Sequence, residues 1–190
     1  PLLGAGQGRV PSAGGTDGQL ALGGLTDGVS VVDMAAAYSV FPRNGLYVEP
    51  RTYTKVTRVL DDGTEEVLLD NTQNQPEAVL SEETTWYIND MLKNVVTGKF
   101  GGATGTGAQL SGMTVAGKTG TAQKADHKAG SYGAKRLASF VGFLPADNPR
   151  YLIVVLVDEP TKNQYGGVVA APVFREIASR AITYSGAIVP

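Results

Sequence analysis

Three strand-forming segments followed by one amphipathic helix make up the C-terminal half of this sequence. The segments run from Met113 to Gln123, from Ala138 to Leu144 and from Tyr151 to Val157, and the third is the nearly continuous apolar run of a buried strand. Pro172 suits the first turn of the helix, Gly186 suits its end, and one stripe is apolar: Ala170, Val173, Phe174, Ile177, Ala178, Ala181 and Ile182. Strands followed by such a helix predict a sheet covered by helices, an α+β fold.

An earlier helix is predicted from a capping residue and from apolar periodicity. Ser30 and Asp33, three residues apart, form a capping-box pattern. Pro42 and Gly45 end the periodic stretch that follows, whose apolar residues are Val31, Met34, Ala35, Tyr38 and Phe41. These residues predict an amphipathic helix that packs against the sheet.

A hairpin and another helix are predicted between this helix and the strands. The β-prone runs Tyr53 to Leu60 and Glu66 to Leu69 flank the turn signal Asp61-Asp62-Gly63. Ser81 begins the helix, Gly98 ends it, and one face is apolar: Ile88, Met91, Leu92 and Val95. The glycine-rich segment 101–107 is predicted to be a flexible connecting loop.

Composition fits one globular domain and excludes several classes of site. Residues 1–24 lack helical or strand periodicity and are predicted to form a loop segment, which leaves 25–190 as the folded unit. The chain has no cysteine, which excludes a disulfide framework, a zinc–thiolate site and a thiol nucleophile. A net charge of -2 gives no indication of a nucleic-acid partner. The apolar run Leu152 to Val157 is far shorter than the ~20 residues of a membrane-spanning helix.

The chemically informative motif is Lys118-Thr119-Gly120-Thr121, which lies in the first predicted strand of the C-terminal half. A strand directs the hydroxyls of Thr119 and Thr121 to the same side, and Gly120 leaves room for a ligand to approach the backbone. A lysine and two hydroxyls are groups that hold a carboxylate and a neighbouring acyl carbonyl. The motif alone is short, and a solvated lysine on a surface strand is the alternative interpretation.

The context of this motif resembles penicillin-binding transpeptidases, whose motifs include Lys-Thr-Gly. The resemblance covers nearly the whole chain in the family's order and is carried by residues 21–30, 35–38, 115–123, 138–147, Tyr165-Gly166-Gly167 and 171–177. It implies the α+β fold of penicillin-binding proteins and serine β-lactamases, with a five-stranded antiparallel sheet covered by helices. Residues 25–190 would then be the C-terminal part of a transpeptidase domain.

The resemblance also implies an activity and a set of site residues. Such enzymes cross-link peptidoglycan through an acyl-enzyme formed on a serine, and β-lactams occupy the same groove. Lys118 would supply electrostatic stabilisation, Thr119 and Thr121 would hold the substrate carboxylate beside Gly120, and the backbone N–H of Thr121 would form half of the oxyanion hole. The implied partners are D-Ala-D-Ala stem peptides, β-lactams and divisome or elongasome proteins. No cofactor or metal is implied, and the implied location is the outer face of the cytoplasmic membrane.

The sequence departs from the family in lacking two motifs. None of its nine serines has a lysine three residues later, so the nucleophile motif Ser-x-x-Lys is absent, and so is Ser-x-Asn. Tyr87-Ile88-Asn89 resembles a variant of the second motif but falls inside a predicted amphipathic helix, where packing explains it better. We expect the missing motifs to lie on a preceding segment of the same domain, and this chain alone to be inactive.

Two other functions stay open, and so does the subclass. The chain is alternatively a non-catalytic module that binds cell-wall peptides or a partner protein, or a relative of the serine β-lactamases. Residues 22–96 have features of the bifunctional enzymes, whereas 117–177 resemble the monofunctional ones, which we favour. An upstream Ser-x-x-Lys in the parent gene would discriminate the enzyme from the binding module.

Weaker candidates have simpler structural explanations. His127 lies in the polar stretch Lys124 to Arg136, which is predicted to be a solvent loop between two strands. The acids around the hairpin turn, Asp61, Asp62, Glu65 and Glu66, are typical of a solvated tip rather than of a metal site. Trp86 and Tyr87 lie near the start of their helix, where they either pack or help to line a groove, and packing is the interpretation that we favour.

Overall fold

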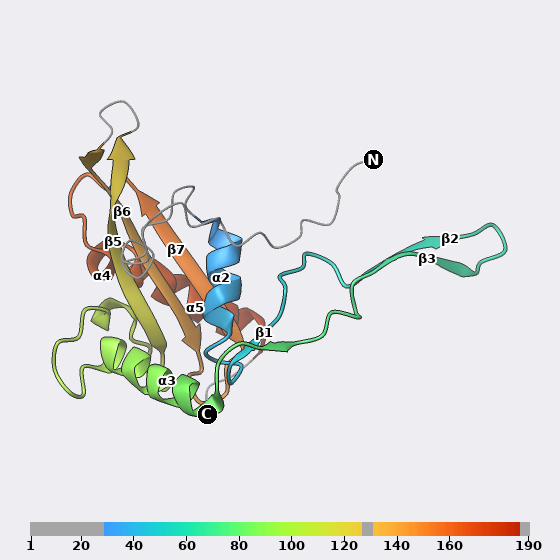
Figure 1. The fold of residues 1–190 in the computed structure, drawn as a ribbon, viewed down its shortest axis with the longest axis horizontal. Helices are drawn as coiled ribbons and strands as arrows, with labels where there is room; N and C mark the ends of the chain where they lie inside the picture. The colour runs from blue at the N-terminus through green and yellow to red at the C-terminus, as the bar shows by residue number, and fades with distance from the viewer. Residues whose placement is uncertain (1–28, 127–130, 187–190) are drawn as a thin grey trace.

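The computed structural model describes residues 29–126 and 131–186 and has the predicted α+β composition (Figure 1). The predictions for residues 1–24 and for His127 lie outside these residues. The helices are α2 (Val31–Ser39), α3 (Glu82–Thr97), α4 (Gly166–Val169) and α5 (Ala171–Tyr184), with a 3-10 helix η1 at Thr106–Ala108. The strands are β1 (Leu46–Tyr47), β2 (Lys55–Val59), β3 (Glu65–Asp70), β4 (Glu77–Ala78), β5 (Ala116–Asp126), β6 (Ser131–Leu144) and β7 (Tyr151–Asp158).

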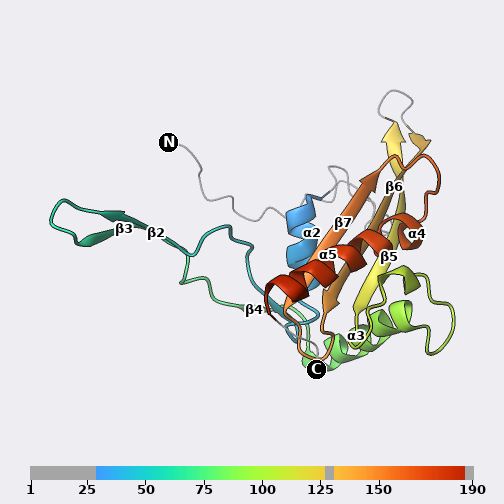
Figure 2. The same cartoon turned by 180° about the vertical axis from the view of Figure 1, so that it is seen from behind.

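The main sheet is antiparallel and has the order β5-β6-β7. Helix α2 lies on one face of this sheet, and α5 covers the other (Figures 1 and 2). Helix α3 crosses the lower end of β5 in Figure 1. The resemblance implies five strands, of which the described part of the chain supplies three in this sheet. In these residues the outer edge of β5 pairs with no other strand.

The core lies between the sheet and α5. Phe140 on β6 and Phe174 on α5 are both fully buried, and their ring centroids are 4.8 Å apart in an edge-to-face arrangement. Alternation along the strands places Val155 on the same side of the sheet, and Ala178 closes the contact from α5. A second cluster, formed by Leu92, Ala116, Phe143 and Ala146, attaches α3 to the opposite face. The sheet is therefore anchored on both sides, as the predicted apolar stripes require.

The two predicted capping residues begin the helices as expected. The backbone N–H of Asp33 donates to the Ser30 hydroxyl at 3.1 Å, and the N–H of Thr84 donates to the Ser81 hydroxyl at the same distance. Gly98 ends α3 with a left-handed φ of 70°, the conformation that glycine adopts most readily. Serine caps and the glycine stop thus set the ends of these helices at the predicted positions.

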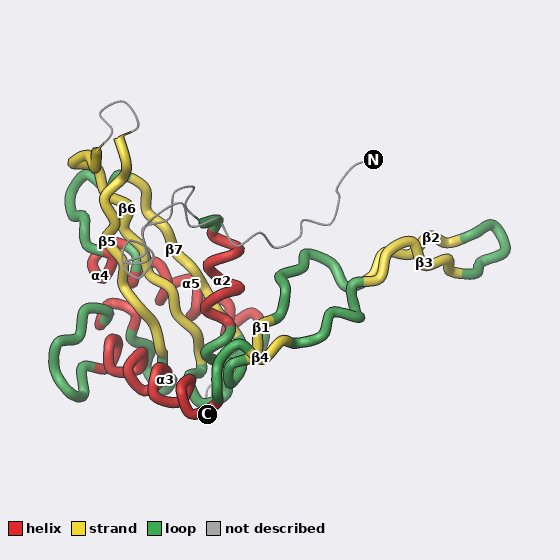
Figure 3. Tube along the Cα trace, viewed as in Figure 1, coloured by secondary structure: helices red, strands yellow, loops and turns green. Residues whose placement is uncertain are grey.

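The predicted hairpin is present and extends away from the rest of the molecule (Figure 1). Strands β2 and β3 pair antiparallel, with an irregularity in register between Val56 and Thr57. Long irregular segments connect this ribbon to the short β1–β4 pair (Figure 3). All residues of β3 are exposed, including Val67, Leu68 and Leu69. The acidic turn is a solvated tip, as predicted, where Asp62 accepts a hydrogen bond from the N–H of Thr64 at 2.9 Å.

The prediction that Lys124 to Arg136 forms a solvent loop is wrong. Strand β5 continues to Asp126 and β6 begins at Ser131, so the two strands include most of this stretch. The backbone ladder persists through a register shift between Gln123 and Ala125, although the side-chain pattern is no longer apolar. A strand extension made of polar residues lacks the apolar alternation by which strands are recognised in a sequence.

The predicted packing of Trp86 and Tyr87 is also wrong. Their exposed fractions are 64% and 55%, and the two rings contact each other edge to face with centroids 5.0 Å apart. Both residues lie in the first turns of α3, whose buried residues are Thr85, Leu92 and Val96. Among the described residues, no helix has the length and apolar character needed to cross a membrane.

Candidate active site

Lys118, Thr119 and Gly120 line a cavity of about 450 Å³ between β5 and α2. The Lys118 side chain is exposed, and its Nζ donates to the Thr119 carbonyl at 2.9 Å. The remaining lining residues come from α2 and its start and from all three strands of the main sheet: Val29, Ser30, Val31, Met34, Tyr38, Ala122, Leu137, Ser139, Val141, Val154 and Leu156. Burial raises the pKa of the Tyr38 phenol above its ordinary value. The cavity therefore combines an apolar wall with one cationic side chain at its edge.

The hydroxyls of Thr119 and Thr121 contact other segments of the chain. Thr119 Oγ1 lies 2.9 Å from Thr104 Oγ1, in the loop that joins α3 to β5. Thr121 Oγ1 accepts a hydrogen bond from the N–H of Gly166 at 3.3 Å, at the start of α4. Because a hydroxyl carries one proton as well as acceptor sites, the proton of Thr121 stays available for a ligand. Each hydroxyl of the motif is thus oriented by a neighbour.

Helix α4 approaches the motif so closely that there is no space for side chains on its first two residues, Gly166 and Gly167. A Cβ on Gly166 would lie 2.1 Å from the Ser139 carbonyl oxygen and 2.4 Å from that of Gly120. A Cβ on Gly167 would lie 1.9 Å from the carbonyl oxygen of Thr104. Separations under 3 Å from backbone atoms require one of the segments to move. The two glycines therefore fix how β5, β6 and the Thr104 loop meet.

Gly120 has no side chain at a position of β5 where the paired strand lies very close. A Cβ at this position would lie 2.3 Å from Ser139 Oγ on the paired strand β6. Gly120 and Ser139 are direct partners in the register, one residue from the Thr121–Ala138 pair. The described residues leave the other edge of β5 unpaired, so backbone groups along this edge are available to a ligand.

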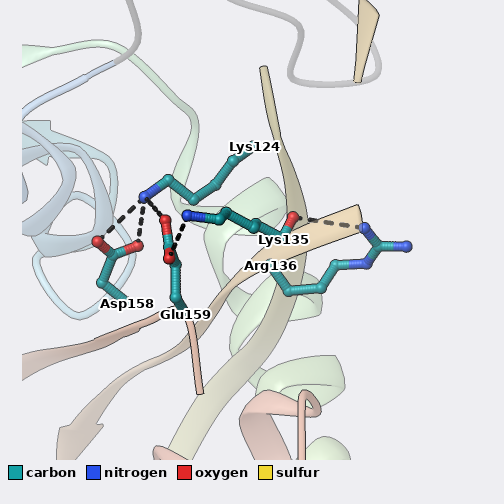
Figure 4. Close-up of polar contacts among 5 residues, drawn as sticks. All are labelled: Lys124, Lys135, Arg136, Asp158 and Glu159. Atoms are coloured by element: carbon teal, nitrogen blue, oxygen red, sulfur yellow. Dashed lines mark hydrogen bonds and ion pairs between the residues drawn. The ribbon is translucent and has the colours of Figure 1, made fainter. Parts of the chain in front are cut away.

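Four charged side chains cluster at the far end of the main sheet, beyond the motif (Figure 4). Lys124 Nζ lies 2.8 Å from Asp158 Oδ1 and 2.8 Å from Glu159 Oε1. Lys135 Nζ lies 2.8 Å from Glu159 Oε2. Hydrogen bonds from Lys124, which contributes most, and from Lys135 hold the pKa of the Glu159 carboxyl below its ordinary value. Hydrogen bonds to Asp158 and Glu159 raise the pKa of Lys124.

The predicted site residues are near one another but do not all face one cavity. Lys118, Thr119 and Gly120 line it, whereas Thr121 is not among its lining residues and hydrogen bonds to α4 instead. Sequence reasoning missed Thr104 and the close contact of Gly166. Both lie in glycine-rich segments, 101–107 and 165–167, and a glycine that must pack against a backbone leaves no periodic pattern to detect.

Comparison with known proteins assigns a family to this arrangement. A family model described as "Penicillin binding protein transpeptidase domain" matches residues 5–179. The chain is 36% identical over 159 residues to penicillin-binding protein PbpB of Mycolicibacterium smegmatis. The aligned region covers 80% of this chain and 24% of that protein. It is 39% identical over 110 residues to the probable peptidoglycan D,D-transpeptidase PenA of Neisseria flavescens, with coverages of 57% and 26%.

A solved structure with the same fold is penicillin-binding protein 3 of Mycobacterium tuberculosis in complex with aztreonam. It aligns with a TM-score of 0.71 and 30% sequence identity, over 85% of this chain and 36% of that one. The chain spans about a quarter of the length of the two curated relatives named above. The similarity therefore includes β5 and its surroundings together with most of the chain.

Proposed function

Since this chain belongs to the penicillin-binding protein transpeptidase family, we propose that it forms part of a serine D,D-transpeptidase that cross-links peptidoglycan stem peptides. The observation that carries the proposal is the Lys-Thr-Gly motif on an open-edged strand beside a cavity. Relatives named peptidoglycan D,D-transpeptidases support it. The reaction class is acyl transfer, in which a serine hydroxyl attacks the carbonyl of the penultimate D-alanine and the terminal D-alanine leaves. An amine of a second stem peptide then takes the acyl group and releases the serine.

The residues of the motif have separate roles in this proposal. Lys118 supplies positive charge at the cavity edge, where negative charge develops during acyl transfer. Thr119 and Thr121 hold the substrate carboxylate, since each hydroxyl is oriented by a neighbour and Thr121 retains a proton to donate. The backbone N–H of Thr121 is one of the two donors that stabilise the oxyanion. Gly120 supports this arrangement by adding no side chain to the cavity that it lines with Lys118.

The nucleophile is supplied by a segment outside this sequence. None of the nine serines is followed by a lysine at the third position, and the chain spans about a quarter of its curated relatives' length. We expect Ser-x-x-Lys and Ser-x-Asn to lie in the remaining part of the relatives' length. A catalytic centre would then form where that segment meets the cavity beside Lys118.

The ligands and location follow from the same proposal. Related structures contain aztreonam and ampicillin, so we expect β-lactams to acylate the complete enzyme and to occupy the groove along β5. The peptidoglycan substrate of the proposed enzyme lies on the outer face of the cytoplasmic membrane, so we expect the enzyme to act there. Proteins of the division or elongation machinery are the expected partners.

A labelling experiment tests the proposal. The longer polypeptide that includes this chain is incubated with a fluorescent penicillin, beside this chain alone, and both are separated on a denaturing gel. We expect covalent label on the longer polypeptide and none on the chain alone. Label on the chain alone would reveal a nucleophile among its own serines, and no label on either would contradict the transpeptidase.

The absence of a nucleophile motif favours one other candidate, a module that binds stem peptides without reacting with them. Such a module would bind a D-Ala-D-Ala peptide reversibly and would leave no covalent label. Equilibrium binding of that peptide to the chain alone, measured by calorimetry, discriminates this module from the enzyme.

A further inference from the structure

We propose that Glu159 is a positioning residue, which sets the geometry of the Lys-Thr-Gly strand by bridging Lys124 and Lys135 at the far end of the main sheet (Figure 4). This inference rests on the transpeptidase function proposed above. Glu159 lies at the point where β7 ends and where the segment leading to α4 begins. Its carboxylate contacts one lysine from each of the other two strands of the sheet.

The charged cluster around Glu159 connects all three strands. Lys124 belongs to β5 and lies three residues after Thr121, while Lys135 belongs to β6. Glu159 contacts both, one oxygen to each at 2.8 Å, whereas Asp158 contacts Lys124 alone. The backbone N–H of Glu159 also donates to the Arg136 carbonyl at 3.0 Å. Glu159 is therefore the residue of the cluster whose side chain bridges β5 and β6.

The backbone at Glu159 is held in a strained conformation. Its φ is 47°, in the left-handed region, which a glutamate rarely adopts. Such a conformation persists where surrounding contacts enforce it, and here two ion pairs and a backbone hydrogen bond do so. The same turn directs the chain away from β7 into segment 159–165. The side-chain contacts of Glu159 thus fix the direction in which this segment leaves the sheet.

Segment 159–165 in turn delivers α4 to the motif. Gly166 follows this segment and donates its N–H to Thr121 Oγ1, and a Cβ on it would overlap the carbonyl oxygens of Ser139 and Gly120. The position of α4 and that of the motif therefore depend on each other. Glu159 controls both ends of this arrangement, through Lys124 on β5 and through the start of the segment before α4.

Neutralising Glu159 would leave Lys124 and Lys135 facing each other without the carboxylate between them. Asp158 would still hold Lys124, so like-charge repulsion would act mainly between β5 and β6. We expect a small displacement of Thr121, whose backbone N–H must donate a hydrogen bond to the developing oxyanion. Displacements of about 1 Å in such a site reduce rates by up to about a hundredfold. Asp158→Asn should have the smaller effect, because Asp158 contacts one lysine only.

The test uses the longer polypeptide with Glu159→Gln and the matched control Lys93→Gln. The control removes the Lys93–Asp147 ion pair, which has the same N–O distance of 2.8 Å but lies at the other end of the sheet. Its lysine side chain is similarly exposed, with an exposed fraction of 32% against 36% for Lys124. Single-turnover acylation by a fluorescent penicillin gives the first-order rate at saturation and the half-saturating concentration. We expect Glu159→Gln to lower the rate about tenfold and to change the half-saturating concentration less than about twofold. Lys93→Gln should match the wild type.

Ionic strength supplies an independent measurement. Raising salt from about 0.05 M to 1 M screens exposed ion pairs, so the wild-type rate should fall toward that of Glu159→Gln, whose own rate should change little. Equal rates for wild type and Glu159→Gln at low salt would overturn the inference, and so would an equal loss in Lys93→Gln. A wild-type protein that takes no label would instead contradict the proposed function. Thermal melts of each variant show that the compared proteins are folded.

Discussion

The hydroxyl of Thr119 lies 2.9 Å from the hydroxyl of Thr104, although the two residues belong to different segments on either side of η1. Thr119 belongs to the Lys-Thr-Gly strand, and Thr104 belongs to the glycine-rich loop that follows α3. The loop therefore orients a hydroxyl of the candidate active site. This contact makes the loop part of the site, although its sequence indicated only a connection.

Replacing Thr104 should weaken acylation without unfolding the protein. Thr104→Val removes the hydroxyl partner of Thr119, and a lost hydrogen bond of this kind costs about 1 kcal/mol. We expect fluorescent-penicillin acylation of the longer polypeptide to fall about fivefold, the same energy expressed as a rate. Thr106→Val is the control, since the Thr106 side chain is exposed and makes no hydrogen bond within the described residues. Equal acylation of the two variants would show that the Thr104 contact is dispensable.

Placing a side chain on Gly166 should disturb the motif. In Gly166→Ala the new methyl would lie 2.1 Å from the Ser139 carbonyl oxygen on β6 and 2.4 Å from the Gly120 carbonyl oxygen on β5, so α4 must move away from both strands. We expect a loss of about 2 kcal/mol or more in the free energy of unfolding, measured by urea denaturation of this chain. Val168→Ala on the same helix, at a position 56% exposed, should cost less than about 1 kcal/mol. Wild-type stability of Gly166→Ala would mean that α4 does not pack against β5 as described.

The contact between Phe140 and Phe174 should dominate the stability of the sheet–helix core. Both rings are fully buried, so Phe174→Ala loses apolar burial and leaves a cavity, at a cost of about 3–5 kcal/mol. Val173, the preceding residue of α5, is 43% exposed, and Val173→Ala should cost below about 1 kcal/mol. Equilibrium denaturation followed by circular dichroism measures both values. Similar losses in the two variants would place the core elsewhere.

The pH dependence of stability should reveal the ion pairs of Glu159. Its pKa is lowered in the folded protein, so its contribution to stability is present above the ordinary value of 4.5 and is lost as pH falls through the folded value. We expect the Tm difference between wild type and Glu159→Gln to be constant from about pH 5 to 8 and to shrink below that range. Glu65→Gln serves as the control, because Glu65 makes no ion pair in the described part of the chain. A Tm difference that persists at pH 3 would exclude the charge of Glu159 as its cause.

Apolar periodicity and capping residues predicted most of the architecture. The apolar stripe that includes Phe174 and Ile177 identified α5, although the exposed fraction of Ile177 is 43%. The capping residues Ser30 and Ser81 marked the starts of α2 and α3. These signals are local, and local signals suffice for helices and for apolar strands. The extension of β5 and β6 past Gln123 and Arg136 was missed, because backbone pairing continues there without an apolar pattern.

The candidate site was predictable only in part, for a related reason. Lys118, Thr119 and Gly120 are adjacent in the sequence, so a short motif identified them, and they line one cavity. Thr104 and Gly166 contact the motif from other segments, through a hydroxyl contact and a missing Cβ, and Glu159 contacts Lys124, three residues after the motif. A single sequence carries no record of such tertiary contacts. Only the folded arrangement of the chain brings these residues together with strand β5.

The β2–β3 ribbon implies that this chain does not denature in one step. Within the described residues its strands pair with each other and with no other strand, and β3 is exposed along its whole length. An isolated two-stranded ribbon is marginally stable in water, so it can open while the sheet and α5 stay intact. The chain then holds two cooperative units of unequal stability. Calorimetric and van't Hoff enthalpies should therefore disagree for the whole chain and converge once residues 55–70 are removed.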